Sequence, residues 1–348
     1  MKSRDLWKNL IEKHGYIFVC APMADVTDYA EREMLAKYSR MGQNDSSLHA
    51  LWTEFVSADG FIHPIGQISL MRDLEYTNSQ RPLIAQLFGS NPEKMKIAAK
   101  KVAELGFDGI DINAGCPDDT ICKQGAGSCL IKNPDILKSL IDACREGAPE
   151  LPISIKTRIG WSKYDEDYIK SVIDMKPDLL TIHARTKTEM SKPEPHWDVL
   201  KEIVDLAHGS GVPVLANGNI TSFEKADEVR TLTGCDGVMI GKGIFGKPWI
   251  FDKQELLKPK NLEELISMCK EHVDLYMYKI GTTRPAHYHC GDLEFDLEGG
   301  EVKAKSFALM AKHFKAYFSE FPQYHDIKQR LVMSRSYKEC MEILNSIE

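Results

Sequence analysis

Short apolar segments alternate with longer segments of helical periodicity about eight times before residue 250 of this chain. A helix after each strand returns the chain to the same edge of a sheet, so the alternation predicts parallel strands joined by helices. The expected strands are residues 17–23, 51–56, 83–88, 109–113, 153–157, 179–184, 212–216 and 237–240. Eight such units in about 235 residues indicate a closed (β/α)8 TIM barrel of the α/β class. The alternative is a doubly wound open sheet, which would need fewer units or more residues.

Helical periodicity replaces this alternation after residue 251. The helices expected between the strands include residues 92–105, 134–145 and 223–231, and those expected after residue 251 are 262–278, 304–321 and 337–347. We therefore expect two domains, a barrel over residues 1–251 and a smaller, all-helical domain over residues 252–348.

Residues 287–301 are acidic and contain glycine. Such a segment is typical of a solvated loop or a short hairpin. A metal site that includes the neighbouring His287, His289 and Cys290 is the minor alternative.

The chain has 44 Lys and Arg against 51 Asp and Glu, a net charge of −7, which excludes a protein that coats nucleic acid or an anionic membrane with its whole surface. Its nine cysteines are odd in number and contain no C-x-x-C pair, which is typical of a reducing compartment. The N-terminus is charged throughout, and no window approaches the ~18 apolar residues of a membrane span. We expect a cytoplasmic protein without a membrane helix.

Polar residues close nearly every expected strand. In a barrel these strand ends meet at the carboxyl end, where active sites lie. Met23 and Ala24 follow the first strand, and the polar residues concerned are Glu54, Gln86, Asn113, Lys156, Arg158, His183, Arg185 and Asn217. Residues two apart on a strand share a face. Three pairs can therefore point at one central space, namely Asp111 and Asn113, Lys156 and Arg158, and His183 and Arg185.

Glycines follow the seventh and eighth strands, in residues 216–219 and 240–243. Backbone N–H groups and a helix N-terminus at this position often bind a phosphate in barrels. Asn217, Gly218, Gly241 and Lys242 therefore indicate a phosphorylated ligand.

Cys116 lies in a short loop between Gly115 and Pro117 after the fourth strand. A thiol held there can act as a nucleophile or as a proton donor. An unperturbed thiol, with a pKa of ~8.5, is mostly protonated at neutral pH, which favours the second role unless a base lies nearby.

These segments together resemble the tRNA-dihydrouridine synthases over residues 16–251. The resemblance is carried by APMADVTD, TEFVSADG, QLFGSNPE, DINAGCPDD, GAGSCLIKNP, ISIKTRIGW, TIHARTK, VLANGNI and GVMIGKGIFGKPWIF. The segment KSFALMAKHFKAYF is similar to the helical RNA-binding domain of the bacterial branch of the family. Asp25 stands where that family usually has Gly, Phe55 where it has Met, Asn219 where it has Asp and Lys242 where it has Arg.

The resemblance implies an enzyme that binds FMN and reduces a uridine of tRNA to 5,6-dihydrouridine with NADPH or NADH. It implies that Cys116 donates a proton to carbon 5 of uracil. The residues implied for FMN are Pro22, Met23, Ala24, Gln86, Lys156, His183, Asn217, Gly218, Asn219, Gly241 and Lys242, and those implied for the substrate are Asn113, Arg158 and Arg185. The form of the family also suggests a monomer.

Residues 301–340 carry eight Lys and Arg against four Asp and Glu, so this stretch is locally positive. Lys305, Lys312 and Lys315, with His313, recur near helical spacing and could face the phosphates of RNA, whereas an ordinary solvated face is the alternative. Together with the resemblance, this pattern predicts that Lys312 and Lys315 contact tRNA.

Two other functions are compatible with parts of this pattern. Another FMN-dependent barrel oxidoreductase, acting on a small pyrimidine or enone, would share the phosphate site and the lysine of the fifth strand. A tRNA-binding or chaperone protein without catalysis would need only the fold and not the catalytic residues. The presence of Cys116, Lys156 and His183 argues against this alternative.

Overall fold

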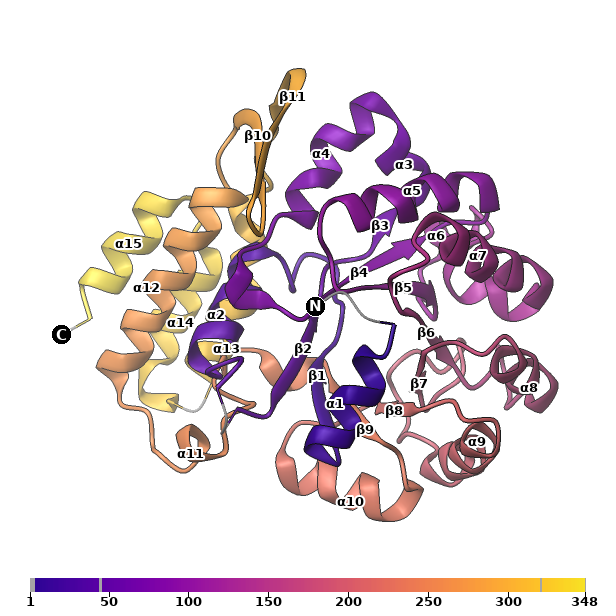
Figure 1. Cartoon of the computed structure of the whole chain (residues 1–348). Coiled ribbons are helices and arrows are strands. Elements are labelled where there is room, and N and C mark those ends of the chain that lie inside the picture. Colours follow the sequence, from indigo (N-terminus) through magenta and orange to yellow (C-terminus); the bar gives the residue numbers. More distant parts are fainter. Residues whose placement is uncertain (1–3, 44–45, 320, 348) are drawn as a thin grey trace.

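The strands of the barrel form one parallel, closed sheet (Figure 1). The computed structural model describes residues 4–43, 46–319 and 321–347. The strands are β1 (Ile17–Cys20), β2 (Leu48–Trp52), β3 (Val56–Ser57), β4 (Leu83–Phe88), β5 (Gly109–Ala114), β6 (Ile153–Arg158), β7 (Leu179–His183), β8 (Val214–Asn217) and β9 (Gly237–Ile240). β1 pairs with both β2 and β9, which closes the barrel. The predicted TIM-barrel fold is confirmed.

The second expected strand, residues 51–56, is in fact the end of β2 and the short β3, both paired with β4. Residues 53–55 lie between the two strands, although the Thr53 N–H still donates to the Ile84 carbonyl of β4. The Glu54 carboxylate instead accepts from the Asp25 N–H in the loop after β1. Composition does not distinguish such an interruption from a continuous strand, because it depends on a partner in another loop.

Amphipathic helices cover the outside of the barrel. They are α2 (Tyr29–Tyr38), α3 (Ala58–Ile62), α4 (Pro64–Leu74), α5 (Pro92–Glu104), α7 (Pro134–Gly147), α8 (Glu166–Asp174), α9 (Trp197–Gly209) and α10 (Phe223–Thr233). α5 shows how the sequence sets their bounds. The Asn91 side chain caps it by accepting from the Lys94 N–H, Pro92 occupies its first turn, and Met95, Ala99 and Val102 form its buried face.

The helix α1 (Leu6–His14) lies over the amino ends of the strands. Trp7 packs there with residues of β1, β2, β4, β7, β8 and β9, and its ring stacks on Trp52 with centroids 5.4 Å apart. The barrel is therefore closed at its amino end, and the carboxyl ends of the strands remain for a site.

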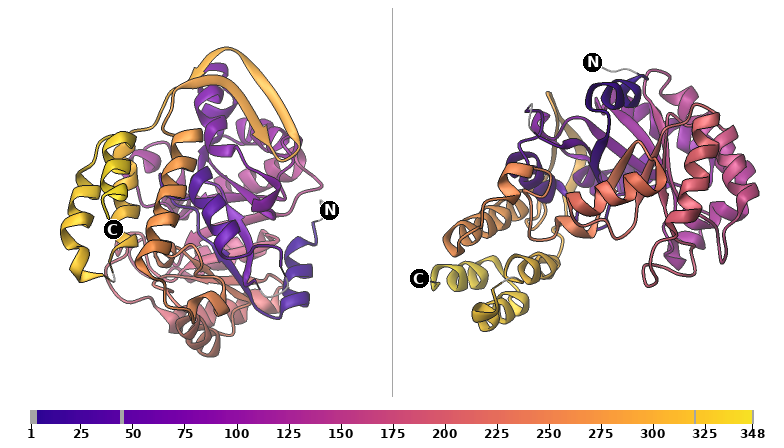
Figure 2. Two further views of the ribbon diagram at one scale, coloured as in Figure 1. Left: turned by 90° about the vertical axis from the view of Figure 1, so that its left-hand side faces the viewer. Right: turned by 90° about the horizontal axis from the view of Figure 1, so that it is seen from below.

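Helices dominate the C-terminal region and are grouped at one side of the barrel (Figure 2). They are α11 (Lys253–Leu256), α12 (Leu262–Lys279), α13 (Ala311–Tyr317), α14 (His325–Met333) and α15 (Tyr337–Asn345). The helix expected at residues 304–321 is shorter, because a 3-10 turn, Phe307–Met310, precedes α13. The helix α14 was not predicted. α12 shares one hydrophobic core with α2 of the barrel, in which Met34 and Tyr276 take part.

The acidic segment forms a hairpin of β10 (Arg284–Cys290) and β11 (Leu293–Val302), one of the two structures expected for it. Its inner face packs against the barrel, where the Tyr288 hydroxyl donates to the main-chain oxygen of Ile68 in α4. The description of residues 252–348 as all-helical left out this hairpin. Its signal in the sequence is the alternation of Leu293, Phe295 and Leu297 with the acidic residues 294, 296 and 298.

No helix in the described part of the chain has the length and hydrophobicity that a bilayer crossing requires.

Candidate functional site

A cavity of about 220 Å³ opens at the carboxyl ends of β6 to β9. Nine of the residues predicted to bind a cofactor line it, namely Pro22, Met23, Lys156, His183, Asn217, Gly218, Asn219, Gly241 and Lys242. The structure does not bring Ala24 and Gln86 to the cavity wall: Ala24 is exposed, and Gln86 is buried below it. Ser191 and Thr221 also line the cavity. They lie in loops that no sequence pattern marked.

The loop after β8 has a backbone that few residues can adopt. Gly218 has a φ of 131°, and a Cβ at this position would lie 3.2 Å from the His183 ring. Asn219 follows with a φ of 47°, a left-handed conformation that asparagine tolerates better than most residues. The two residues therefore let the main chain form the cavity wall, where it can closely approach a ligand.

Lys156 supplies a positive charge to the cavity. Its ammonium lies 3.2 Å from the Asn217 Oδ1, while the Asn217 amide donates to the Met239 carbonyl. Burial, and next the neighbouring charge of Arg158, lower the pKa of Lys156 to about 8. An anionic ligand would favour the charged form and raise that pKa again.

His183 and Arg185 lie side by side at the end of β7. The Arg185 Nη1 is 3.0 Å from the His183 Nε2. Arginine can only donate, so this ring nitrogen is the acceptor and the imidazole is neutral. Burial, and next the charge of Arg158, hold the pKa of His183 well below its usual value. The Arg185 Nη2 is buried without a hydrogen-bond partner among the described residues, which leaves one donor for a ligand.

Gln86 and Asn113 form a network beneath the cavity with Asp111. The Gln86 amide donates to the Asp111 carboxylate at 2.6 Å and accepts from the Asn113 amide at 2.9 Å. Ser154 donates to the other oxygen of Asp111, and burial raises the pKa of this carboxyl to about 6. Asp111 was expected to face the central space together with Asn113, but it was not among the residues predicted to bind the cofactor or the substrate.

The loop that carries Cys116 is held by hydrogen bonds from both sides. The Asn113 side chain accepts from the main-chain N–H of Cys116 at 2.9 Å, and Ser128 donates to the Cys116 carbonyl at 2.9 Å. Burial raises the pKa of the Cys116 thiol above its usual value. The thiol is therefore protonated at neutral pH and suited to act as an acid.

Arg158 was predicted to bind the substrate, but its guanidinium contacts main chain. It donates to the carbonyls of Gly115, Thr186 and Met190 at 2.7 to 3.0 Å. These bonds join the Cys116 loop to the loop after β7, so Arg158 supports the walls of the site.

The expected basic stripe is wrong for two of its four members. Lys305 points into the barrel, with its ammonium 3.1 Å from Asp25, 3.3 Å from Glu54 and 3.2 Å from Asp73. His313 is also buried. Helical spacing places side chains on one face, but it does not reveal whether that face meets solvent or another loop.

The other two lysines of the stripe are nearer the surface. Lys312 donates to the Asp25 carbonyl at 2.8 Å and is half-buried, whereas Lys315 is exposed. Asp25 has a φ of 53°, in the left-handed region, which explains why a glycine is expected there.

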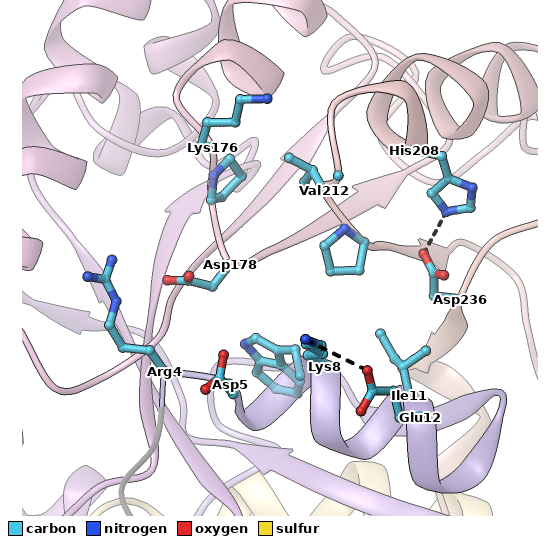
Figure 3. A pocket seen from close by; sticks show the side chains of 14 residues that line it. Arg4, Asp5, Lys8, Ile11, Glu12, Lys176, Asp178, His208, Val212 and Asp236 are labelled. Atoms are coloured by element: carbon cyan, nitrogen blue, oxygen red, sulfur yellow. Dashed lines mark hydrogen bonds and ion pairs between the residues drawn. The ribbon is translucent and has the colours of Figure 1, made fainter.

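A second, more open cavity of about 560 Å³ lies beneath α1 (Figure 3). It includes Asp178, Pro213 and Asp236, which precede β7, β8 and β9. This is the amino end of the barrel, away from the network around Lys156 and Cys116. The position favours a structural role, because α/β barrels carry their chemistry at the other end.

The closed parallel barrel and the charged cavity at its carboxyl end define an α/β-barrel enzyme. Residues 19–346 match the model of the family described as Dihydrouridine synthase, and the chain belongs to this family. It is 31% identical over 335 residues to a probable tRNA-dihydrouridine synthase of Staphylococcus aureus (strain MRSA252), covering 95% of this chain and 93% of that one. It is 30% identical over 350 residues to probable tRNA-dihydrouridine synthase 2 of Bacillus subtilis (strain 168), covering 99% and 97%.

Among solved structures, histamine dehydrogenase from Rhizobium sp. 4-9 is similar with a TM-score of 0.50 and 14% identity, covering 74% of this chain and 48% of that one. Similarity at this level supports the barrel fold alone.

Proposed function

We propose that this protein reduces a uridine of tRNA to 5,6-dihydrouridine, using bound FMN and NADPH or NADH as the reductant. The observation that carries the proposal is the pairing of two features at one end of the barrel. One is the cavity with the Lys156 cation and the unpaired Arg185 donor, and the other is the protonated Cys116 thiol in its anchored loop. The names of the similar proteins point to the same reaction.

The residues present fit a flavin phosphate and ring. Gly218 and Gly241 allow the main chain to approach a phosphate after β8 and β9, and Lys242 adds a positive charge there. Pro22 and Met23 border the cavity from the loop after β1, where they would contact the flavin. Lys156 would hold its pyrimidine edge. FMN, when bound and reduced, supplies the hydride that saturation of a uracil ring requires.

The side chains of the cavity would then stabilise the charge of the bound ligand and orient it. The Lys156 ammonium stabilises negative charge on the ligand that it contacts. His183, held neutral by its bond with Arg185, offers a polar but uncharged contact beside it. Gln86 would act through Asn113 rather than by direct contact, because it is fully buried beneath the cavity and bonded to Asp111 and Asn113.

Cys116 would complete the reaction by transferring its thiol proton to carbon 5 of the uracil. A base within folded tRNA cannot reach this site, so the uridine must be extruded from the stack. Arg185, with its unpaired Nη2, would orient the extruded base, and Asn113 would hold the Cys116 loop against it.

Electron transfer from the reduced protein tests the function. The purified protein should show a flavin absorption spectrum, and NADPH-reduced protein should be reoxidised by unmodified tRNA but not by free uridine. Reoxidation by a free pyrimidine or an enone would instead support a small-molecule oxidoreductase. Absence of flavin would support a binding protein without catalysis.

We also propose that residues 1–251 catalyse and residues 252–348 bind tRNA, in a monomeric, cytoplasmic enzyme. The grouping of α12 to α15 at one side of the barrel supports this division. The charge excess of residues 301–340 supports it as well, although Lys305 is occupied inside the protein. Lys315 is exposed and is the better candidate for a phosphate contact, with Lys312 beside the barrel loop.

Lys315→Glu should weaken tRNA binding and lower the slope of log Kd against log salt by about one unit, since one phosphate contact is lost. Binding would be measured between about 50 and about 200 mM salt. Lys100→Glu, an exposed lysine on α5, is the control and should change neither quantity. Equal effects of the two substitutions would contradict a specific contact. Lys312→Glu is a less specific test of tRNA contact, because it also breaks the hydrogen bond to the Asp25 carbonyl.

FMN affinity should fall as the pH rises through about 8, the pKa of Lys156 in the unliganded protein. Binding favours the protonated lysine, so above this pH the complex must take up a proton. The dissociation constant should then rise up to about tenfold per pH unit. Fluorescence titrations of the apoprotein from about pH 7 to about pH 9 avoid Arg158, whose pKa is lowered to about 10 by burial. Lys156→Met should bind weakly at every pH, and a flat wild-type profile would contradict the role.

A further inference from the structure

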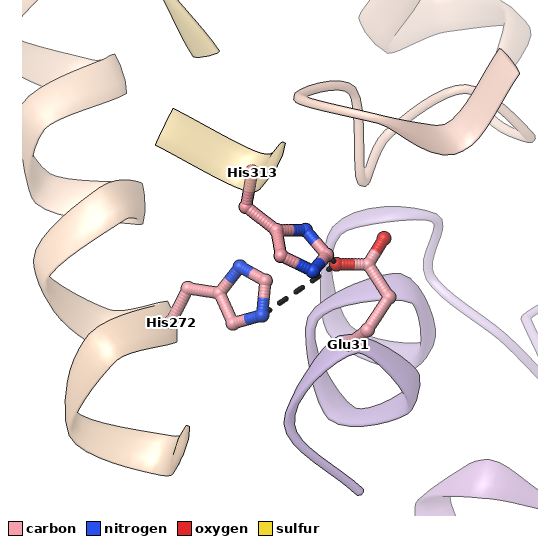
Figure 4. Close-up of side chains that lie close together, drawn as sticks. All are labelled: Glu31, His272 and His313. Atoms are coloured by element: carbon pink, nitrogen blue, oxygen red, sulfur yellow. Dashed lines mark ion pairs between the residues drawn. The ribbon is translucent and has the colours of Figure 1, made fainter. Parts of the chain in front are cut away.

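Three buried side chains from three helices converge where the C-terminal region meets the barrel (Figure 4). Glu31 comes from α2, His272 from α12 and His313 from α13, and each is at most 2% exposed. Their ligand atoms all lie within 4.8 Å of one another. None of the three takes part in the site described above.

These groups are not satisfied by hydrogen bonds. The Glu31 Oε2 is 3.6 Å from the His272 Nε2 and 3.5 Å from the His313 Nδ1, beyond the ~2.7–3.2 Å of an N–H···O bond. The Glu31 Oε1 and both of these ring nitrogens are buried without a hydrogen-bond partner in the part of the chain that the structure describes. Native proteins rarely leave such groups unpaired, because each costs desolvation energy that nothing offsets.

The distances fit a shared metal ion. Zinc lies ~2.0–2.2 Å from nitrogen and oxygen ligands, and a tetrahedron of that radius has edges of about 3.4 Å, close to the two observed separations. The Glu31 Oε1 is available as a further donor. The Tyr317 hydroxyl lies 3.2 Å from the His272 Nδ1, so it can accept from that nitrogen and leave Nε2 for the metal.

We propose that Glu31, His272 and His313 bind a divalent transition metal ion, best matched by Zn²⁺, which joins α12 and α13 to the barrel. The ligand set is one carboxylate and two imidazoles, a combination that suits zinc or iron better than Mg²⁺ or Ca²⁺. Complete burial leaves no path for a substrate, so the ion is structural.

Protonation of the histidines explains the unpaired groups less well than a metal ion does. Burial lowers the pKa of His272 to about 3, and burial followed by the effect of His272 lowers that of His313. Burial also raises the pKa of Glu31, so its carboxylate ionises here only beside a positive charge, which neither ring readily supplies. Neutral imidazoles are the form that a metal binds.

An ion here would also position the tRNA-binding region. His313 lies next to Lys312, which bonds the Asp25 carbonyl, and its ring lies 5.7 Å from that of Phe245 in the loop after β9. Holding α13 at this point fixes Lys312 and Lys315 relative to the mouth of the barrel. This part of the role rests on the proposed tRNA function, whereas binding of the ion does not.

Metal analysis of the full-length protein, purified without chelators or an affinity tag of histidines, tests the site. The wild type should contain stoichiometric metal, and Glu31→Gln, which keeps the size of the side chain, should lose it. The double variant His287→Ala/His289→Ala is the matched control, because it disrupts the other group of possible metal ligands, His287, His289 and Glu294 on the hairpin. The control should keep the metal. Loss of metal from the control but not from Glu31→Gln would overturn the assignment.

Measurements on the wild type keep the test decisive if Glu31→Gln does not fold. Chelator treatment should lower the melting temperature, and Zn²⁺ should restore it by about 5 °C or more at saturation. Co²⁺ in place of Zn²⁺ should give the visible absorption of a tetrahedral site. A wild type without metal, whose melting temperature responds to neither ion, would overturn the proposal. If the wild-type protein contains the metal but forms no dihydrouridine in tRNA, only the proposed function is refuted.

Discussion

Cys116→Ala should retain bound flavin and oxidation of NADPH but lose dihydrouridine formation by about 10²- to 10⁴-fold, the usual contribution of a positioned acid. The main chain of the Cys116 loop is held by Asn113 and Ser128, so removal of the sulfur leaves the loop in place. Reduction of the flavin by NADPH does not need the thiol, whereas protonation of carbon 5 of the uracil does. The two half-reactions should therefore separate in this variant.

Single-turnover reduction of tRNA, followed by product analysis, measures the second half-reaction. Cys122→Ala is the control, since Cys122 is a partly buried cysteine of the following helical turn, bonded to Ser128. It should turn over like the wild type. Full product yield from Cys116→Ala would remove the acid role, and loss of NADPH oxidation would point to a collapsed site instead.

Lys305→Met should destabilise the protein by about 3–5 kcal/mol, the usual result of breaking a buried charge cluster by removing one partner. The Lys305 side chain is only 16% exposed and faces the carboxylates of Asp25, Glu54 and Asp73. Burial opposes its charge, yet the carboxylates Asp73 and Glu54 outweigh burial and raise the pKa of Lys305. Methionine would remove this cation from all three carboxylates, of which Asp73 keeps its ion pair with Arg72.

This loss should depend on pH with a definite sign. Burial, and next the charge of Asp73, already raise the pKa of Glu54 to about 7, and Lys305 opposes that rise. In Lys305→Met the folded-state pKa rises further above the unfolded value. The folded variant therefore binds more protons than the unfolded chain, and its stability falls as the pH rises from about 5 to about 8.

Urea unfolding at the two ends of this range measures the difference between variant and wild type. The difference should be larger at the higher pH. Lys303→Met is the control, because that lysine is 74% exposed and pairs with Glu301 at the surface. It should change stability by less than about 0.5 kcal/mol. A deficit of Lys305→Met that is the same at both pH values would contradict the carboxylate cluster.

Much of the barrel and of its site could be predicted because the relevant signals are local. Strands such as β4 and helices such as α5 carry their periodicity and caps within a few residues. Once eight strand–helix units are recognised, their carboxyl ends must meet. That topology is why Lys156, His183, Asn217 and Lys242 could be expected in one cavity before any distance was known.

The direction of a side chain away from its own element was not predictable in the same way. Arg158 closes β6 as expected, but it is occupied by three main-chain carbonyls from other loops. Gln86 ends in a network with Asp111 and Asn113 instead of the cavity wall. Both outcomes depend on partners far away in sequence.

The sequence by itself determined the barrel, its open end, the chemical types gathered there and the dihydrouridine synthase family. Only the tertiary structure decided that Lys305 neutralises barrel carboxylates, that the acidic segment packs as a hairpin, and that Glu31 meets His272 and His313. Periodicity reports the face on which a residue lies. Which groups oppose that face is set by long-range packing, and charge and burial then decide whether a residue is a surface contact, a buried ion pair or a ligand.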